Sequence, residues 1–209
     1  MRKSLLTASL IALAIASPAA FAHKEGDIIV RAGAITVAPN EKSSDIKVGG
    51  TPIDAKATLD SDTQLGLNFA YMLTNNVAIE LLAATPFTHN VGTKGLGGLK
   101  LGEVKQLPPT LSALYYPMES SSAFQPYLGV GINYTWFFDD KLSNEAEAQG
   151  FSGLDMKDSW GLAGQVGMDY MLTDNIMING QVRYIDIDTT GTTYAGSTKV
   201  KVDVDVDPW

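Results

Sequence analysis

After residue 22 the sequence has no apolar run near the ~20 residues that a membrane-spanning helix requires. The one pronounced run, Leu5 to Ala16, follows two basic residues and precedes the small-x-small sequence AFA at residues 20–22. This order is typical of a cleaved secretory signal peptide, and the run is too short to cross a membrane. We therefore expect a signal peptide at residues 1–22 and a single mature domain at residues 23–209.

The sequence also lacks cysteine and has only two histidines. In an exported protein the absence of cysteine excludes disulfide cross-links, thiol catalysis and cysteine-ligated zinc. His23, near the expected mature N-terminus, and His89, in an expected loop, do not have the spacing of a metal-binding pair. The segment GLGGLK at residues 95–100 lacks the strand-to-helix setting of a phosphate-binding loop. The sequence therefore predicts no enzyme, no cofactor and no metal.

Positive charge is scarce. The chain has 15 Lys and Arg against 23 Asp and Glu, which gives a formal net charge of −8. An acidic chain is a poor ligand for nucleic acid, and it argues against docking on anionic lipid through a broad basic patch.

In several segments of the sequence, apolar residues alternate with small or polar residues at a period of two, which is typical of β-strands. In YLGVGINYTWFF, residues 127–138, one face carries Leu128, Val130 and Ile132, and the opposite face carries glycine and asparagine. Similar alternation predicts further strands around residues 28–37, 63–72, 77–82, 107–116, 160–170 and 176–184, and a last strand that begins at residue 199.

The connections alternate in length. YMLTNNVAI at residues 71–79 returns as YMLTDNIMI at residues 170–178, and both fit tight turns, as does MESSSA at residues 118–123. Between these turns lie long polar segments at residues 40–60, 88–102, 139–157 and 189–198, the third with a short helix expected over NEAEA. Seven connections join eight strands and place both termini on the side of the short turns, which is the bacterial outer-membrane pattern of short periplasmic turns and long outer loops.

This pattern assigns the apolar face to lipid and the small and polar face to the inside of an eight-stranded antiparallel up-and-down β-barrel that spans the membrane. Arg31, Glu80, Asp169 and Arg183 fall on the inner face and are expected to pair there. The alternative is a secreted β-sandwich, which also alternates. Polar inner faces and aromatic residues at the strand ends favour the barrel, and the aromatics are Tyr71, Tyr115 and Tyr170 near the short turns and Trp136, Phe138 and Trp160 near the long loops.

The stretches ELLAATPF, LPPTL and GINYTWFF, with RAGAITVAP and KDSWGLAGQVGMDYML, resemble the OmpW family of small bacterial outer-membrane proteins over the whole mature chain. The resemblance implies an eight-stranded barrel that serves as a conduit for small hydrophobic molecules, and in some members as a colicin receptor. It also implies about ten further residues after Trp209 to complete the last strand, taking a spanning strand as ~9–11 residues. Our expectation is that this sequence is an incomplete version of a longer chain.

An eight-stranded barrel is too narrow for a wide aqueous pore. Parity directs several large apolar side chains inward, and we interpret them as an apolar upper funnel that is constricted near Leu82 and Arg183. Plain interior packing is the alternative for each of them. The candidate channel-lining residues are Leu82, Leu114, Phe137, Met171, Met177 and Arg183.

Pro108 and Pro109 lack two successive backbone N–H donors, which weakens the strand ladder on the loop side of the fourth strand. A defect there could release an apolar solute sideways into lipid, and the alternative is a strand beginning without a transport role. Acidic residues near the long-loop rim could bridge Ca²⁺ or Mg²⁺ to lipopolysaccharide, although a solvated rim is the simpler interpretation. These acidic residues are Asp186, Asp188, Asp203, Asp205 and Asp207.

The sequence therefore predicts an outer-membrane channel for small hydrophobic solutes, with outer-membrane lipid and lipopolysaccharide as its surroundings. A structural barrel without transport, or a receptor for a colicin or phage, is the second hypothesis. A lipid-modifying barrel enzyme that uses Ser112 or Ser159 with a rim aspartate is the third.

Overall fold

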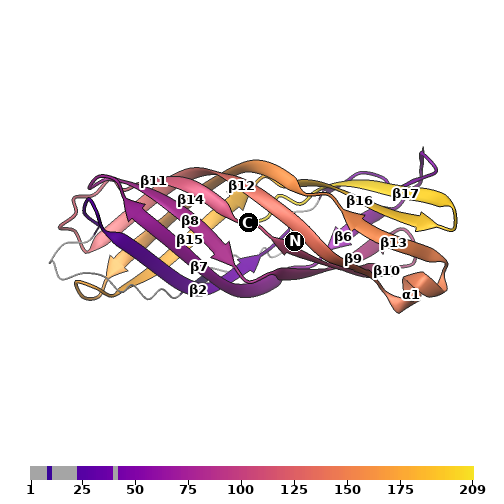
Figure 1. The fold of residues 1–209 in the computed structure, drawn as a ribbon, viewed down its shortest axis with the longest axis horizontal. Helices are drawn as coiled ribbons and strands as arrows, with labels where there is room; N and C mark the ends of the chain where they lie inside the picture. The colour runs from indigo at the N-terminus through magenta and orange to yellow at the C-terminus, as the bar shows by residue number, and fades with distance from the viewer. Residues whose placement is uncertain (1–8, 11–22, 40–41) are drawn as a thin grey trace, which may run out of the picture.

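The structure of the chain is a computed structural model, and it describes residues 9–10, 23–39 and 42–209. Of the expected signal peptide, only Ser9–Leu10 belongs to the described residues, where it forms strand β1. Figure 1 shows an elongated molecule made almost entirely of antiparallel strands, with the short turns at one end and hairpins with a short helix at the other.

Seven long strands of the described residues form a continuous wall, which we call the barrel wall. Their hydrogen-bonded order is β15–β14–β12–β11–β8–β7–β2, so strands adjacent in this series are antiparallel neighbours. The strands are β2 (Ile28–Val37), β7 (Asp62–Met72), β8 (Val77–Ala84), β11 (Thr110–Tyr115), β12 (Phe124–Leu142), β14 (Ser159–Met171) and β15 (Met177–Ile185).

The two faces of the wall differ as the alternation predicts. On β12 the side chains of Leu128, Val130 and Ile132 are 52%, 69% and 51% exposed, whereas Tyr127 and Asn133 on the other parity are buried inside. A large exposed apolar face is unusual for a water-soluble protein and is what a lipid-facing strand requires. The opposite assignment, with a packed core behind the apolar face as in a β-sandwich, is therefore wrong.

The repeated sequence YMLT(N/D)N forms the same turn twice. At residues 73–76 the hydroxyl of Thr74 accepts from the backbone N–H of Val77 (3.0 Å), and at residues 172–175 that of Thr173 accepts from Ile176 (3.1 Å). In each turn the threonine closes the loop on the strand that follows. Asn76 also donates to the Tyr116 carbonyl (2.7 Å), which ties two short turns together.

The long polar segments are not loops, contrary to our expectation. They are strands that continue the barrel beyond the membrane, and with helix α1 and the far end of β12 we call them the extension (right side of Figure 1). Its strands are β3 (Lys42–Ser43), β4 (Lys47–Val48), β5 (Thr51–Pro52), β6 (Lys56–Leu59), β9 (Phe87–Lys94), β10 (Lys100–Leu107), β13 (Phe151–Met156), β16 (Asp188–Ala195) and β17 (Thr198–Asp205). Helix α1 (Asn144–Ala148) is the helix expected over NEAEA, and Ser143 caps it by accepting from the Ala146 N–H (3.0 Å).

The eighth position of the wall lies between β15 and β2. The last strand expected from residue 199 is present as β17, which pairs with β16 in the extension, and residues 208 and 209 contact the wall. There the Ile185 N–H donates to the Pro208 carbonyl (3.2 Å), and Trp209 and Ala38 exchange two backbone hydrogen bonds (3.2 Å each). Further along the same seam β1 pairs with β15, with Ser9 opposite Gln181.

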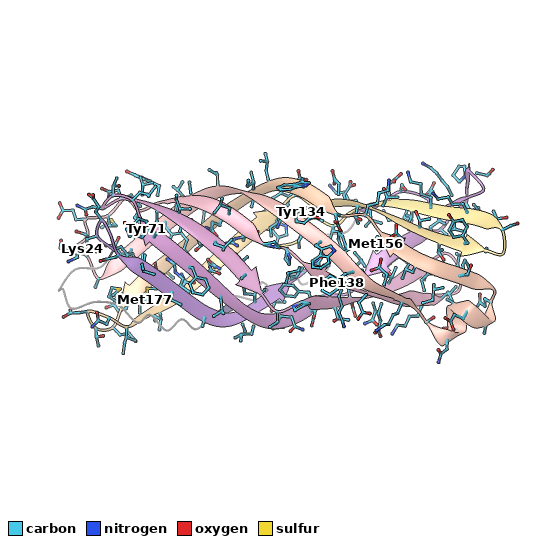
Figure 2. The ribbon with its side chains drawn as sticks, viewed as in Figure 1. Lys24, Tyr71, Tyr134, Phe138, Met156 and Met177 are labelled. Carbon is cyan, nitrogen blue, oxygen red and sulfur yellow. The ribbon has the colours of Figure 1, made fainter. Side chains whose placement is uncertain are left out.

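Aromatic side chains mark both edges of the apolar band. Tyr71, Tyr115 and Tyr170 are exposed near the short turns, as predicted, and Figure 2 shows Tyr71 at that end. At the other edge the rings of Trp136 and Phe138 lie 4.8 Å apart. The described residues include no helix long and apolar enough to cross a membrane.

Candidate functional site: a divided barrel interior

Arg31 on β2 is the centre of a network of buried charges inside the barrel wall. Its guanidinium donates from Nη1 to Glu80 Oε2 (2.9 Å), from Nε to Asp169 Oδ1 (3.0 Å) and from Nη2 to Asp169 Oδ2 (2.6 Å). All three side chains are buried. Because an unpaired buried charge costs several kcal/mol, each member of this network requires the others to be in place.

Arg183 on β15 joins the same network from the other side. Its Nη2 donates to Glu80 Oε1 (2.6 Å), its Nε donates to Gln165 Oε1 (2.8 Å), and the Gln165 amide donates to Glu80 Oε1 (2.9 Å). The strands β2, β8, β14 and β15 are thus connected across the interior by charged and amide groups. The pairing predicted for Arg31, Glu80, Asp169 and Arg183 is confirmed.

His23 and two tyrosines complete the network, and sequence reasoning missed all three. The His23 ring is buried, with Nε2 2.8 Å from Asp169 Oδ2, and it contacts the Tyr116 ring edge-on at 5.0 Å. Arg31 Nη2 donates to the Tyr116 hydroxyl (2.6 Å), and the Arg31 guanidinium lies 5.0 Å from the centre of the Tyr127 ring. The inward parity of Tyr127 was available in the sequence, but His23 precedes every strand that the sequence predicts and carries no periodic signal.

A small apolar cluster lies between this network and the short turns. Three of the predicted channel-lining residues belong to it: Leu114 and Met177 are fully buried, and Met171 packs against them. Figure 2 shows Met177 at the short-turn end of the molecule. These three residues therefore do not contribute to a funnel at the long-loop end, where we had expected them, because their strands run to the opposite edge of the wall.

The larger apolar cluster fills the extension. It includes Phe137, the fourth predicted residue, and next to the cluster lies a small, partly open cavity of about 30 Å³. The surface of this cavity is almost entirely apolar, and its lining includes Ile46, Leu59, Val91, Leu101, Met156 and Val204. Typical sites for small organic ligands have volumes of roughly 300–1,000 Å³. A small organic molecule therefore fits here only if the lining side chains move apart.

Leu82 and Arg183, the expected constriction, both lie on the inner face and are largely buried. Leu82 is on the last rung that β8 shares with β11, opposite Thr110, close to the level at which the barrel wall passes into the extension. Arg183 belongs to the charged network described above. The interior is thus divided along its axis into an apolar upper part, a charged middle part and a small apolar lower part.

The wall has a gap at Pro108 and Pro109. The rungs between β8 and β11 end at Leu82 opposite Thr110, and pairing resumes between β9 and β10 at Phe87 opposite Gln106. Between these rungs no backbone pairing joins residues 83–86 to residues 107–109. The Pro109 carbonyl instead accepts from the backbone N–H of Tyr134 (3.2 Å), so this segment is held to β12 alone.

His89 is in a strand and not in a loop, contrary to our expectation. Its ring is buried in the extension, with Nδ1 2.6 Å from the Asp60 carbonyl oxygen and Nε2 2.9 Å from the Gln106 amide nitrogen. The neutral ring satisfies both contacts, because Nδ1–H donates and Nε2 accepts. Burial lowers the pKa of His89, which keeps the ring in this neutral form.

Three of the five acidic residues near the rim form a compact group. Carboxylate oxygens of Asp186, Asp188 and Asp207 lie within 4.8 Å of one another, and burial together with these neighbours raises the pKa of Asp188. Asp203 is separate and pairs with Lys201 (3.1 Å) and Lys47 (3.8 Å).

Comparison with known proteins identifies the family. The family model described as the OmpW family matches residues 24–209. The chain belongs to the OmpW family. It is 47% identical to outer membrane protein W of Vibrio cholerae, in an alignment that covers 94% of this chain and 90% of that protein.

A solved structure agrees with the architecture. The outer-membrane protein OprG of Pseudomonas aeruginosa superposes with a TM-score of 0.88 at 54% identity, covering 90% of this chain and 93% of OprG. A more distant relative, 26% identical over 80% of this chain and 77% of its own length, is the dibenzothiophene metabolism operon protein PahQ of P. aeruginosa. This OmpW-family chain is therefore a bacterial outer-membrane β-barrel protein, as the sequence predicted.

Proposed function

We propose that this protein takes up small apolar molecules through its extension and releases them sideways into the outer membrane, without changing them chemically. The observation that carries the proposal is the order of features along the interior: an apolar cavity in the extension, a gap in the wall where the extension joins the barrel wall, and a layer of buried ion pairs below. The name of the PahQ operon, which refers to a polycyclic aromatic sulfur compound, agrees with an apolar solute.

The charged layer favours a sideways exit over an axial one. An apolar solute that moved further down would have to separate Arg31 from Asp169 or Arg183 from Glu80, and breaking such buried pairs costs about 3–5 kcal/mol. The cavity surface in the extension is almost entirely apolar, so an apolar solute that leaves through the wall does not have to separate these ion pairs.

The gap at Pro108 and Pro109 supplies that exit. A β-barrel wall is normally closed by continuous backbone hydrogen bonds, which an apolar molecule cannot cross. Here residues 83–86 and 107–109 make no such bonds with one another. Leu82 and Phe87, both buried on the inner face, make one edge of the gap apolar, and their partners Thr110 and Gln106 on the opposite edge are buried and polar.

The test is uptake of an apolar fluorescent probe into liposomes that contain the purified protein, with Pro108→Val and Pro109→Val combined to restore the missing donors. We expect the double variant to reduce uptake at least severalfold. Pro126→Val is the matched control, because Pro126 on β12 lies within a continuous ladder opposite Met168. A charged probe should enter with neither protein.

Normal uptake by a correctly folded Pro108→Val/Pro109→Val variant would overturn the sideways exit. If the wild-type protein itself passes no apolar probe, the second hypothesis, a structural or receptor barrel, replaces this proposal. Turnover of lipid in detergent that Ser112→Ala or Ser159→Ala abolishes would instead establish an enzyme.

A further inference from the structure

One short sector of the outer surface carries paired positive charge directly above the aromatic edge of the membrane band. Lys105 on β10 lies opposite Phe138 on β12, and one outward step below it Leu107 lies opposite Trp136. Successive outward positions on a strand are about 7 Å apart. The Lys105 ammonium is therefore within reach of the level at which the aromatic ring of Trp136 meets the lipid interface.

A β-bulge brings a second lysine to the same place. Pairing between β10 and β12 shifts between Glu103 and Lys105, and Asp139 takes the left-handed conformation with φ of 54°. Lys105 Nζ lies 2.5 Å from Asp139 Oδ2, and Lys141 Nζ lies 2.9 Å from Asp139 Oδ1. These hydrogen bonds lower the pKa of Asp139 to about 2. We call the three residues the lysine pair and its aspartate.

Both ammonium groups keep donors free for a ligand. An ammonium group has three N–H donors, and each lysine uses one on Asp139, while their side chains are 41% and 68% exposed. Nearby, Glu103 is paired with Lys100 at 3.0 Å, so its charge is already balanced. Asp140, Asp155 and Asp158 lie close by, so the sector as a whole is not positive and only the two ammonium groups offer positive charge to a ligand.

We propose that Lys105 and Lys141 bind a phosphate group of lipopolysaccharide in the outer leaflet. The phosphates of this lipid lie where its acyl chains meet the sugar headgroup, at the depth where aromatic edges of barrels are found. The acyl chains below would contact Trp136 and Phe138, and lysine ammonium groups above bind phosphate oxygens as point charges. This site is independent of the uptake proposal and requires only that the protein spans the outer membrane.

The contrast with the rest of the rim argues for a direct contact. At the seam between β15 and β2 the rim carries Asp186, Asp188 and Asp207, which repel phosphate. Anionic lipid is therefore held by direct contact with the two ammonium groups and not by the charge of the surrounding surface. A broad basic patch, which the overall charge argues against, is not needed for a two-lysine site.

The test is binding of bisphosphorylated lipid A to the purified, folded protein in detergent, measured by native mass spectrometry with EDTA present to remove bridging cations. We expect Lys105→Gln combined with Lys141→Gln to weaken binding roughly tenfold, as expected for the loss of charge-assisted hydrogen bonds. Lys105→Arg with Lys141→Arg should bind nearly as well as the wild type. Asp139→Asn should bind at least as tightly, because it removes a competing carboxylate.

The matched control is Lys56→Gln combined with Lys199→Gln, which removes two exposed positive charges far from the aromatic edge. Lys56 lies opposite Lys94 near the end of β9, and Lys199 is in the β16–β17 hairpin. Equal binding by the control and by the Lys105/Lys141 variant would overturn the proposal. So would equal binding of dephosphorylated lipid A, or displacement of the lipid by millimolar inorganic phosphate, which would indicate a site for the free anion.

Discussion

The barrel wall and the extension are both tubes of antiparallel strands, but their interiors differ in polarity. In the barrel wall, where the outside faces lipid, the interior is held by Arg31, Glu80, Asp169 and Arg183. In the extension, where the outside faces water, the interior is an apolar cluster with a cavity. The wall is thus apolar outside and polar inside, whereas the extension is polar outside and apolar inside. The change from one arrangement to the other occurs near Leu82.

The difference shows that the polarity of each face follows its surroundings and not the fold. A strand in the wall gains from placing its apolar side outward, because lipid replaces the core. Once the strands leave the membrane, the same outward positions meet water and the apolar side chains turn inward. The junction between the halves is therefore where an apolar cavity and a lipid-facing surface come closest to each other.

The largest test of this comparison is Arg31→Ala. The change leaves Asp169 and Glu80 with fewer partners in a buried setting, so we expect the free energy of unfolding to fall by about 3–5 kcal/mol. Urea unfolding in detergent, followed by tryptophan fluorescence, measures the loss. Lys56→Ala, an exposed charge in the extension, should change stability by less than about 0.5 kcal/mol. A loss below about 1 kcal/mol for Arg31→Ala would mean that the charges do not hold the wall together.

A smaller effect is expected in the extension. Leu101→Ala removes a buried side chain that lines the cavity, and such truncations cost about 2–4 kcal/mol. The exposed Leu96→Ala, between β9 and β10, should cost far less and serves as the control. Equal unfolding midpoints for the two variants would show that the extension is not a packed core.

Gly161 tests how closely the backbone packs where the barrel wall joins the extension. A Cβ there would lie 1.8 Å from the Asp186 carbonyl oxygen, whereas a Cβ at Gly164 on the same strand would meet nothing within 4 Å. We expect Gly161→Ala to destabilise the protein by about 1–3 kcal/mol through overpacking against the backbone, and Gly164→Ala to have little effect. The same urea titration distinguishes them, and equal stabilities would contradict the tight junction.

The smallest expected effect is a pH dependence in the extension. The folded-state pKa of His89 is lowered by burial, so the neutral ring contributes stability above its unfolded pKa of about 6.5. As the pH falls below that value the unfolded chain binds a proton that the folded chain does not, and this stability is lost. The urea midpoint should therefore drop less between pH 8 and pH 5.5 in His89→Gln than in the wild type. An identical drop would exclude His89 as a contributor.

The sequence predicted the wall well because one physical rule governs it. Alternation in YLGVGINYTWFF separates the lipid face from the interior, and inner charges such as Arg31 and Asp169 had to pair. The repeat YMLT(N/D)N predicted two turns by its Asn and Asp residues alone.

The extension could not be predicted in the same way. In β9 the buried inward positions include His89 and Thr93 beside Phe87 and Val91, so a strand with an inner face reads as a polar loop. The odd or even position of a residue in a strand shows on which face of the wall it lies, but not how far along the barrel axis. For that reason Met171 and Met177 were wrongly placed in the upper funnel. His23 was missed because its burial depends on Asp169, 146 residues away in the sequence.

Strand β12 runs without interruption for 19 residues from the short-turn edge of the wall into the extension. Its far end pairs with β10 and its near end with β11 and β14, so one strand, with a bulge at Asp139, belongs to both halves. A lid that swings open would have to bend this strand in its middle and break rungs on both of its sides. In the uptake that we propose, solutes are therefore admitted by rotation of individual side chains, and the rate is limited by rotamer changes and not by domain motion.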